Sequence, residues 1–488
     1  MIEYNKDNNM LKFGFETKTT PKMMINIGSL FDVPTSSIIT GVKGETIYNG
    51  GLGNITAIVG AGNNYKSTIL HYMTLSAADK IKASNDTALT TYDTEVNISL
   101  DRLNTLGSKF DNLPHDITTS KDSIWSVVDK SITSANKWAI KINEYAEEKA
   151  KSKATRCTYQ AFTDPYTKKP FESNIPTFVE IDSLTEFEAE STTDMLSNDL
   201  DGSDTNMYAA KQNLFKTKFL STLPRLSSSS NTFFLLTAHI GEKLNMATGP
   251  AIYNQPTRKL QYLKQGDTIK GVGSKFAFLL NNAWFAHTAS VLKNQTTKTP
   301  EYPLNKSDVS ETELNIVRLT QLRGKNGPSG FTLEIIVSQN EGVLPTLTEF
   351  HYIKENNRFG IAGNNVHYNI ELYPTVTINR NTIRTKIDED HLLRRAINIT
   401  SEMLQTRVYH QHINKDELFC TPKELYDDLI KLGYNWDILL NTRGYWTIDQ
   451  YDNKIPFLST IDLLKMRKGL YFPYFLNEDK TLKDKYAK

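Results

Sequence analysis

The chain has 488 residues, which is long for one domain and sufficient for two. Lysine and arginine total 56 and aspartate and glutamate total 55, so the chain lacks the overall positive charge of many nucleic-acid-binding proteins, and any such surface must be local. The two cysteines, Cys157 and Cys420, lack partners at metal-ligand spacing, which argues against a zinc site or a disulfide framework and indicates a reducing compartment.

The first 20 residues are polar and contain no apolar signal core, and we expect them to form a flexible N-terminal arm. The sequence contains no apolar run of about 18 residues, the length that a membrane-spanning helix needs. These features predict a soluble, cytoplasmic protein without a membrane partner.

Residues 21–375 alternate short apolar runs with longer helical patterns. Runs that are apolar throughout indicate strands buried on both faces. Their alternation with helices predicts an α/β core with a mostly parallel central sheet flanked by helices. We expect strands at Ile55–Val59, Ala88–Tyr92, Thr177–Ile181, Thr232–Thr237, Ala277–Ala286, Asn315–Leu319 and Phe331–Val337.

Three long segments interrupt this pattern: residues 108–175, with a helical portion near 124–153, the Ser/Thr/Asp-rich residues 188–206, and the Gly/Pro/Lys-rich residues 243–275. Loops this long inside a compact domain are usually functional or disordered. The composition changes after residue 375, and we expect a smaller C-terminal domain over 376–488 whose role the sequence does not indicate. Within it, Pro422–Leu432 is a helical pattern with Thr421 as a suitable N-cap.

The segment around residue 60 is typical of a strand, a glycine-bearing loop and a helix. Such a loop directs backbone N–H groups at phosphates, and the positive end of the helix adds to the attraction. Lys66 would contact the β- and γ-phosphates of ATP, and the Ser67 hydroxyl would hold Mg²⁺. The usual motif has glycine where this chain has Tyr65, so a loop that merely contains two glycines and a lysine is the alternative. The expected nucleotide-binding loop comprises Gly60, Ala61, Gly62, Asn63, Asn64, Tyr65, Lys66, Ser67 and Thr68.

Polar residues end the strands that follow this loop. Glu95 follows the second strand and could orient a water molecule for attack on the γ-phosphate. Asp182 ends the third strand and is suited to an indirect contact with Mg²⁺, and His239 ends the fourth, near the γ-phosphate. Each signal alone is weak, because a carboxylate at a strand end more often caps a helix and a lone histidine is more often structural. Their order on successive strands favours ATP hydrolysis.

These motifs resemble the RecA family of ATPases, and within it the phage UvsX-type recombinases, which also carry an aromatic residue before the lysine. The segment 92–95 resembles the family strand whose final glutamate activates water, residues 180–184 resemble its Walker B strand, and residues 238–239 resemble its sensor position. The resemblance covers about residues 22–345 and implies a RecA-like core with ATP and Mg²⁺ as cofactors. The family commonly stacks an aromatic residue on adenine where this chain has Arg102, and a guanidinium can also stack on a base.

The segment 322–331 resembles a part of RecA where two lysines cross the subunit boundary to the ATP of a neighbour. In hexameric replicative helicases of the DnaB class, a similar basic pair precedes the same Asn-Gly-Pro-x-Gly pattern, which here is residues 326–330. The resemblance therefore implies that Arg323 and Lys325 act in trans on the charge that develops at the γ-phosphate. A basic β-hairpin with a Gly-Pro turn is the alternative.

Residues 270–278 resemble the end of the second DNA-binding loop of the family. Residues 243–275 carry six basic side chains against one aspartate, a net charge of +5, and such loops neutralise backbone phosphates without reading bases. A solvated surface loop is the alternative, and Tyr262 is the aromatic residue best suited to stack on bases. The expected contacts to single-stranded DNA are Arg258, Lys259, Lys264, Lys270 and Lys275.

The first DNA-binding loop of the family would follow Asp182, but residues 185–205 carry seven acidic side chains and neither lysine nor arginine. This segment is the strongest argument against simple recombinase chemistry. Our leading hypothesis is a DNA-dependent ATPase of homologous recombination and repair, which forms a helical homo-oligomer on single-stranded DNA with ATP at the subunit interfaces. The alternatives are a ring-shaped DnaB-class helicase, disfavoured by the short region before the phosphate loop, and a protein that uses ATP only to polymerise or to hold a partner. Recombination or replication accessory proteins are the other expected partners.

Overall fold

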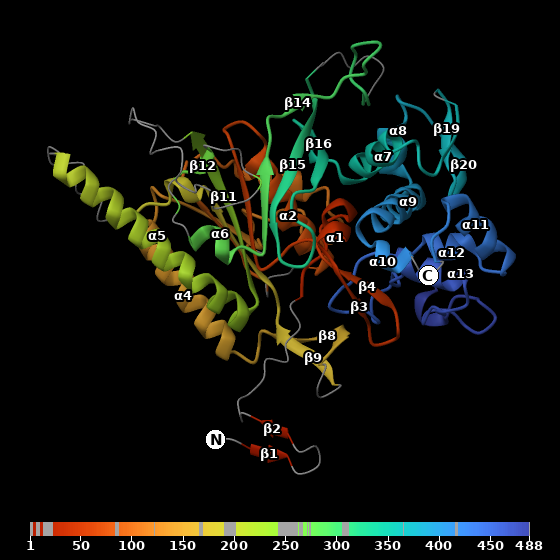
Figure 1. Cartoon of the computed structure of the whole chain (residues 1–488), viewed down its shortest axis with the longest axis horizontal. Helices are drawn as coiled ribbons and strands as arrows, with labels where there is room; N and C mark the ends of the chain where they lie inside the picture. Colours follow the sequence, from red (N-terminus) through yellow and green to blue (C-terminus); the bar gives the residue numbers. More distant parts are fainter. Residues whose placement is uncertain are drawn as a thin grey trace.

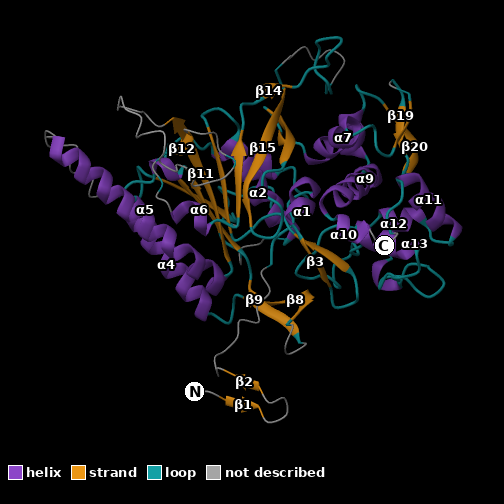
Figure 2. Ribbon diagram, viewed as in Figure 1, coloured by secondary structure: helices purple, strands orange, loops and turns teal. Residues whose placement is uncertain are grey.

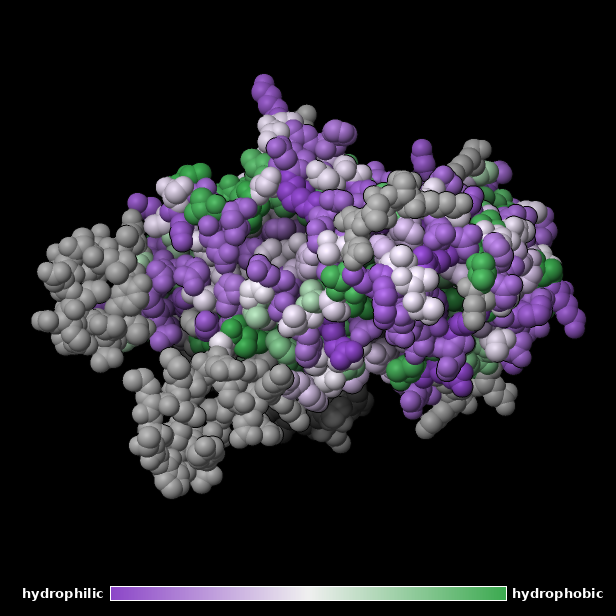
Figure 3. All heavy atoms as spheres, turned by 90° about the horizontal axis from the view of Figure 1, so that it is seen from above, coloured by the Kyte–Doolittle hydropathy of each residue, from purple (hydrophilic) through white to green (hydrophobic). Residues whose placement is uncertain are grey.

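The computed structural model describes residues 3–5, 10–12, 23–82, 87–121, 123–164, 169–189, 202–242, 262, 267–270, 272, 275–304, 312–364, 366–414 and 418–487. The protein is a mixed α/β structure with a large, mostly parallel central sheet flanked by helices (Figures 1 and 2). No helix among these described residues is long and apolar enough to span a membrane. The described surface seen from above is mostly hydrophilic, with hydrophobic side chains in small separate groups (Figure 3).

The central sheet has the strand order β17-β16-β15-β13-β5-β11-β10-β6-β7, with β12 paired to β11 and β14 to β15. The strands from β13 to β7 are parallel, as the sequence predicts, and β15, β16 and β17 extend the sheet with antiparallel pairs. The strands are β5 Ile55–Gly60, β6 Leu89–Asp93, β7 Trp125–Asp129, β10 Thr177–Asp182, β11 Thr232–Glu242, β12 Asp267–Ile269, β13 Asn282–Ala286, β14 Ser290–Val291, β15 Leu314–Gly324, β16 Thr332–Ser338 and β17 Gly342–Val343.

Helices bury both faces of this sheet. Phe233 and Leu235 of β11 belong to the core that packs under α1 (Ser29–Thr35), α2 (Lys66–Lys80) and α3 (Leu100–Gly107). Phe234 and Leu236 belong to the core on the other face, under α4 (Ala135–Lys151), α5 (Gly202–Ser230) and α6 (Lys275–Leu279). Because alternate side chains of a strand point to opposite faces, two covered faces explain why these strands are apolar throughout.

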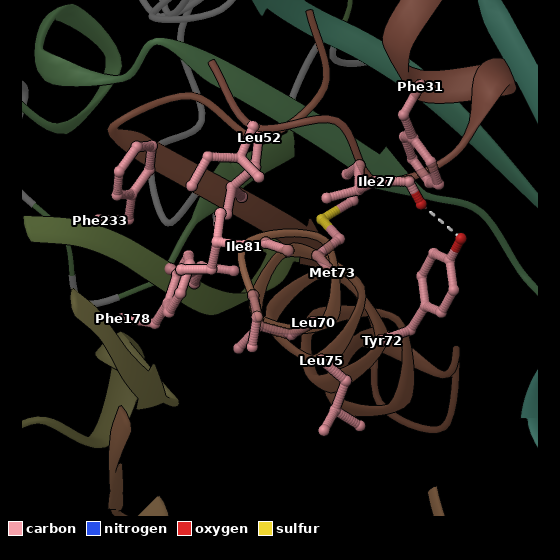
Figure 4. Packing of buried hydrophobic residues seen from close by; sticks show 14 of the residues in the cluster. Ile27, Phe31, Leu52, Leu70, Tyr72, Met73, Leu75, Ile81, Phe178 and Phe233 are labelled. Atoms are coloured by element: carbon pink, nitrogen blue, oxygen red, sulfur yellow. Dashed lines mark hydrogen bonds between the residues drawn. The ribbon is translucent and has the colours of Figure 1, made fainter. Parts of the chain in front are cut away.

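The first of these cores is built around α2, as Figure 4 shows. Leu70 and Met73 of α2 are fully buried and lie toward the sheet, with Phe178 of β10 and Phe233 of β11 in the same cluster. The hydroxyl of Tyr72 donates a 2.5 Å hydrogen bond to the Ile27 carbonyl. This packing fixes the helix that begins at the glycine-bearing loop after β5.

Shorter hairpins lie outside the central sheet: β1 Glu3–Asn5 with β2 Met10–Lys12, β3 Ser37–Thr40 with β4 Thr46–Asn49, and β8 Arg156–Thr163 with β9 Pro170–Asn174. The β1–β2 pair lies within the region that we expect to be an arm. A 3-10 turn, η1, covers Leu184–Glu186 after β10.

The C-terminal part is mainly helical and packs beside α1 (Figure 1). One hydrophobic core joins both sides of residue 375, since Ile336 and Phe350 share it with Ile397 and Leu463. The capping box of Thr421 and Glu424 confirms the helix expected there. The elements are α7 Pro345–Glu355, β18 Ile361–Gly363, β19 Tyr368–Ile370, β20 Tyr373–Ile378, α8 Ile383–Glu389, α9 His391–Tyr409, α10 Gln411–Asn414, α11 Pro422–Lys431, α12 Trp436–Leu440, α13 Thr460–Arg467 and η4 Asp484–Tyr486.

Two local expectations are wrong. The run Ala277–Ala286 is not one strand, because α6 continues to Leu279 and β13 begins only at Asn282. The helical portion expected from residue 124 begins instead at Ala135, and Trp125–Asp129 forms β7. In both places a short apolar run fits a helix and a strand equally well, and pairing with β5 or β6 decides the outcome.

Candidate functional site

The glycine-bearing loop lies at the C-terminal end of β5 and leads directly into α2 at Lys66. A Cβ atom at Gly60 would lie 2.6 Å from the Ala286 carbonyl oxygen, so the close approach of β13 requires glycine there. Asn63 and Tyr65 have φ values of 58° and 56°, in the left-handed region. The loop therefore makes a tight turn that leads from β5 into the N-terminus of α2.

The left-handed backbone of Tyr65 explains why the usual motif has glycine at this position. Glycine adopts a left-handed backbone without steric cost, whereas this chain holds a tyrosine in it. The half-buried ring packs on the core around α2, its pKa is raised by burial, and its hydroxyl bonds the Gln339 side chain. The loop thus keeps the required backbone shape, with side-chain contacts in place of a glycine.

The loop is open to solvent at its tip. Its exposure changes along the chain as follows: Ala61, Gly62 and Asn63 are exposed, Asn64 is buried, and Ser67 and Thr68 in the first turn of α2 are half-buried. An N-terminal helix turn with its N–H groups facing such an opening is a favourable place for an anion.

Lys66 lies inside this loop. Its ammonium group donates a 2.6 Å hydrogen bond to the Ala61 carbonyl oxygen, and the residue is 7% exposed. Burial lowers the pKa of Lys66, and the nearby carboxylates of Asp182 and Glu95 oppose that shift. The structure therefore brings this cation together with two carboxylates that the sequence places on other strands.

Asp182 is held at the tip of β10 by its neighbours. Thr237 of β11 donates a 2.5 Å hydrogen bond to Asp182 Oδ1, and Thr94 donates its backbone N–H to the Asp182 carbonyl oxygen at 2.8 Å. The backbone N–H of Ser183 bonds Thr94 Oγ1 at 2.7 Å. Among the described residues, Asp182 Oδ2 accepts no hydrogen bond, so the carboxylate is fixed while one oxygen stays available.

Glu95 stands on a turn that Asp93 organises. The Asp93 carboxylate accepts four backbone N–H groups, from residues 95, 96, 97 and 98, at 2.8–3.0 Å. Glu95 Oε1 lies 3.1 Å from Nε2 of His239, and Asn97 Nδ2 donates to Glu95 Oε2 at 3.0 Å. His239 pairs in register with Gly60, which places it directly beside the glycine-bearing loop.

Asp93 is a residue of the candidate site that the sequence alone does not single out. Its signal is an aspartate at a strand end followed by a polar turn, which is also common in turns without function. The buried Asp93 is 2% exposed, and its four hydrogen bonds set the position of Glu95.

Arg102 lies on α3, after the Glu95 turn. Its guanidinium donates to the Gln339 carbonyl oxygen at 2.8 Å and to the Asn340 carbonyl oxygen, in the turn between β16 and β17. The same turn supplies the Gln339 side chain that meets Tyr65. Arg102 and Tyr65 of the glycine-bearing loop thus contact the same turn.

Arg323 and Lys325 do not reach this site within the chain. Arg323 pairs with Ala283, and Lys325 donates its backbone N–H to the Asn281 carbonyl oxygen, beside the start of β5. The glycine-bearing loop follows the other end of β5, about 17 Å away at the usual rise of a strand. Within the described part of the chain, Arg323 Nε is buried without a hydrogen-bond partner. A cavity of about 430 Å³ lies at this edge, lined by Asn54, Ile55, Asn231, Phe278 and Lys325 among others.

The segment 243–275, here called the basic loop, is held next to His239 near its C-terminal end. The strand β12 pairs with the extension of β11, and the backbone N–H of Lys270 bonds the His239 carbonyl oxygen at 2.8 Å. Lys270 is exposed, and Tyr262 is 40% exposed. Lys275 is the first residue of α6, but its side chain is not described, and Arg258, Lys259 and Lys264 lie outside the described residues.

The acidic segment after Asp182 is described only to residue 189 and from residue 202. Phe187 is fully buried, and Lys216 of α5 donates to the Thr185 carbonyl oxygen at 2.6 Å. Burial lowers the pKa of Lys216, and Glu188 and Glu186 oppose that shift. In this part, Lys216 of α5 offsets some of the negative charge of Glu186 and Glu188.

No protein-family model matches the sequence, and no curated protein matches it. The functional argument therefore depends on the geometry of the site and on the motifs that build it.

Proposed function

We propose that the chain is a DNA-dependent ATPase with a RecA-like core, which acts in homologous recombination or repair by assembling on single-stranded DNA with ATP at subunit interfaces. The observation that carries this proposal is the convergence of Lys66, Glu95, Asp182 and His239 at the phosphate-loop edge of the sheet. Four strands or loops far apart in the chain contribute to it.

Each residue has a distinct role in this proposal. The loop N–H groups and Lys66 bind the phosphates, and Glu95 orients water and accepts its proton. The Ser67 hydroxyl and the available Asp182 oxygen fit Mg²⁺, which prefers oxygen ligands and neutralises phosphate charge when bound. His239 links Glu95 to β11, which continues into the basic loop, so the nucleotide state and DNA contacts share one element.

The positions of Arg323 and Lys325 support a shared site. Residues at the opposite edge of the sheet reach a phosphate loop only in a neighbouring subunit, and a head-to-tail interface of this kind produces rings or helical filaments. The Asn-Gly-Pro-x-Gly turn after this basic pair also favours the second candidate, a ring-shaped DnaB-class helicase.

The proposal is tested by ATP turnover of the full-length protein, measured as phosphate release with and without single-stranded DNA. We expect DNA to stimulate turnover and Lys66→Ala to reduce it about 100-fold or more, because the cation on the terminal phosphates is lost. Lys141→Ala, an exposed lysine on α4, is the matched control and should retain full turnover. A wild-type protein without turnover, or a fully active Lys66→Ala variant, would refute the proposal.

Electron microscopy with single-stranded DNA and a slowly hydrolysed ATP analogue separates the two assemblies. Helical filaments are expected for the recombination function. Rings alone would favour the helicase, and the absence of both would contradict assembly on DNA.

A further inference from the structure

A buried carboxylate lies on β10, an interior strand of the central sheet, where it contacts α2. Glu180 of β10 is 0% exposed and accepts three hydrogen bonds. His71 Nδ1 of α2 donates at 2.9 Å, Thr91 Oγ1 of β6 donates at 2.8 Å, and Thr74 Oγ1 of α2 donates to the other carboxylate oxygen. One side chain therefore joins α2, β6 and β10.

Trp125 extends this network to β7. Its indole N–H donates to Thr91 Oγ1 at 2.8 Å, and its ring packs edge-on against His71, with ring centroids 5.8 Å apart. Trp125 is 1% exposed, so it covers the network on the side of β7. We call Glu180, His71, Thr74, Thr91 and Trp125 the Glu180 network.

Stability alone does not explain a charge at this position. Moving a carboxylate out of water costs free energy, and apolar side chains of similar volume at such positions are often neutral or stabilising. The neighbours on β10, Phe178, Val179 and Ile181, are fully buried apolar residues. The network is better explained by what its members hold in place.

The elements that Glu180 joins are those that carry the reactive groups. The helix α2 begins with Lys66 and Ser67, β6 leads to Glu95, and β10 ends two residues after Glu180 at Asp182. His71 is five residues after Lys66, about 7.5 Å along the helix axis, so a shift of α2 at the network is passed directly to the phosphate loop.

We propose that Glu180 is a positioning residue, which sets the distance between the phosphate loop on α2 and the carboxylates at the ends of β6 and β10. This inference depends on the proposed ATP hydrolysis. The two directed hydrogen bonds from His71 and Thr74 to Glu180, in a dry interior, resist sliding of the helix over the sheet, which apolar packing alone does not. A misplacement of about 1 Å at a reacting centre can cost about 100-fold in rate.

The main test replaces the network by apolar side chains in one variant, Glu180→Leu with His71→Leu and Thr74→Val. No donor of α2 then remains unpaired. Thr91 still accepts the bond from Trp125, but its own hydroxyl loses the acceptor that Glu180 provided, so we expect the variant to fold with a somewhat lower thermal stability than the wild type. We expect kcat for ATP to fall about tenfold or more and KM to change less than about twofold, since the loop still binds phosphates.

Glu180→Gln is the second variant, in case the triple variant does not fold. It keeps the volume but turns an amide donor toward a hydroxyl or imidazole donor, and we expect kcat to fall about fivefold at unchanged KM. The matched control is Ser76→Ala, which removes the 3.0 Å bond from α2 to the Ile27 carbonyl oxygen and leaves the network intact. Its kcat should equal that of the wild type.

Wild-type kcat in the folded triple variant, or in Glu180→Gln if only that variant folds, would overturn the inference. A loss confined to KM, or an equal loss of kcat in Ser76→Ala, would also overturn it, because either result indicates general loosening of the helix. If the wild type hydrolyses ATP and the variants match it, only this inference fails. If the wild type hydrolyses no ATP, the proposed function fails first.

Discussion

Two buried glutamates of this protein have nearly the same exposure and very different surroundings. Glu180 receives its hydrogen bonds from α2 and β6, the elements that lead to Lys66 and Glu95. Glu349 of α7 is 6% exposed and accepts a 2.9 Å bond from Asn398 Nδ2 on α9. The Glu349 cluster consists of Asp32, Lys80, Glu349, Arg395 and Glu402.

The Glu349 cluster contains three carboxylates and two cations, and it joins the core to the C-terminal helices. Burial raises the pKa of Glu349 to about 7 and that of Asp32 to about 7, although hydrogen bonds and Lys80 oppose both shifts. The two glutamates are similarly buried, but their hydrogen-bond and charge partners lie on different elements, so we expect their loss to have different effects. The Glu180 network should affect turnover, whereas the Glu349 cluster should affect stability and its pH dependence.

The largest expected effect is a loss of ATP turnover at the proposed nucleotide site, on the side of the Glu180 network. Glu95→Gln removes the base but keeps the shape and the contact with Asn97, and we expect turnover to fall about 1,000-fold with little change in stability. Phosphate release and thermal melting measure the two quantities. Glu148→Gln, an exposed glutamate on α4, is the control. Equal losses in both variants would show that Glu95 has no special role.

Arg323→Ala extends the comparison to the opposite edge of the sheet. We expect DNA-stimulated hydrolysis to fall about 100-fold, because a cation on the γ-phosphate of the neighbour is lost, while ATP binding to isolated subunits stays the same. Turnover and equilibrium nucleotide binding separate these outcomes. Arg318→Ala on the same strand, where the exposed Arg318 pairs with Glu334 at 2.9 Å, is the control. Loss of binding by isolated subunits would contradict the trans role.

Glu349→Gln should change stability and leave turnover unaffected. A carboxyl whose folded pKa is raised makes the folded state bind more protons, so its contribution is favourable at low pH and is lost as pH rises from about 4.5 through about 7. The neutral variant escapes this loss. Relative to the wild type, its free energy of unfolding should rise by about 2 kcal/mol between pH 5 and pH 8.

Urea unfolding of both proteins at the two pH values provides this measurement. The exposed Glu355 near the end of the same helix serves as the control in Glu355→Gln, which should show no such difference. A Glu349→Gln effect that does not change with pH would mean that the cluster is not held as the structure indicates.

The smallest expected effect concerns the outer part of the Glu180 network. Trp125→Phe keeps a ring against His71 and removes the indole N–H, so we expect a loss of about 1 kcal/mol in stability and a change in kcat of less than about twofold. Trp446→Phe, which removes a 3.1 Å bond to the Met24 carbonyl oxygen, is a matched control for stability. A large loss of kcat in Trp125→Phe alone would move the boundary of the functional network outward to β7.

The sequence by itself predicted a mostly parallel sheet with both faces covered, and it predicted which polar residues lie at the C-terminal edge of its strands. Strands that are apolar throughout predict two covered faces, and the C-terminal ends of parallel strands share an edge. For that reason the sequence alone predicts Glu95, Asp182 and His239 beside the loop of Lys66. The helix after Thr421 could also be predicted from the sequence, because a capping box is a local signal.

Only the tertiary structure decided which of these groups touch and what lies behind them. The contact of His239 with Glu95, the donors of Glu180 and the bond from Trp446 to Met24 join residues far apart in the chain, and no local pattern specifies such partners. Short apolar runs such as Trp125–Asp129 became strands through pairing, not through propensity. Arg323 and Lys325 lie at the edge of the sheet opposite the loop of Lys66, because β15 pairs antiparallel to β13. This long-range pairing is not encoded by residue types alone.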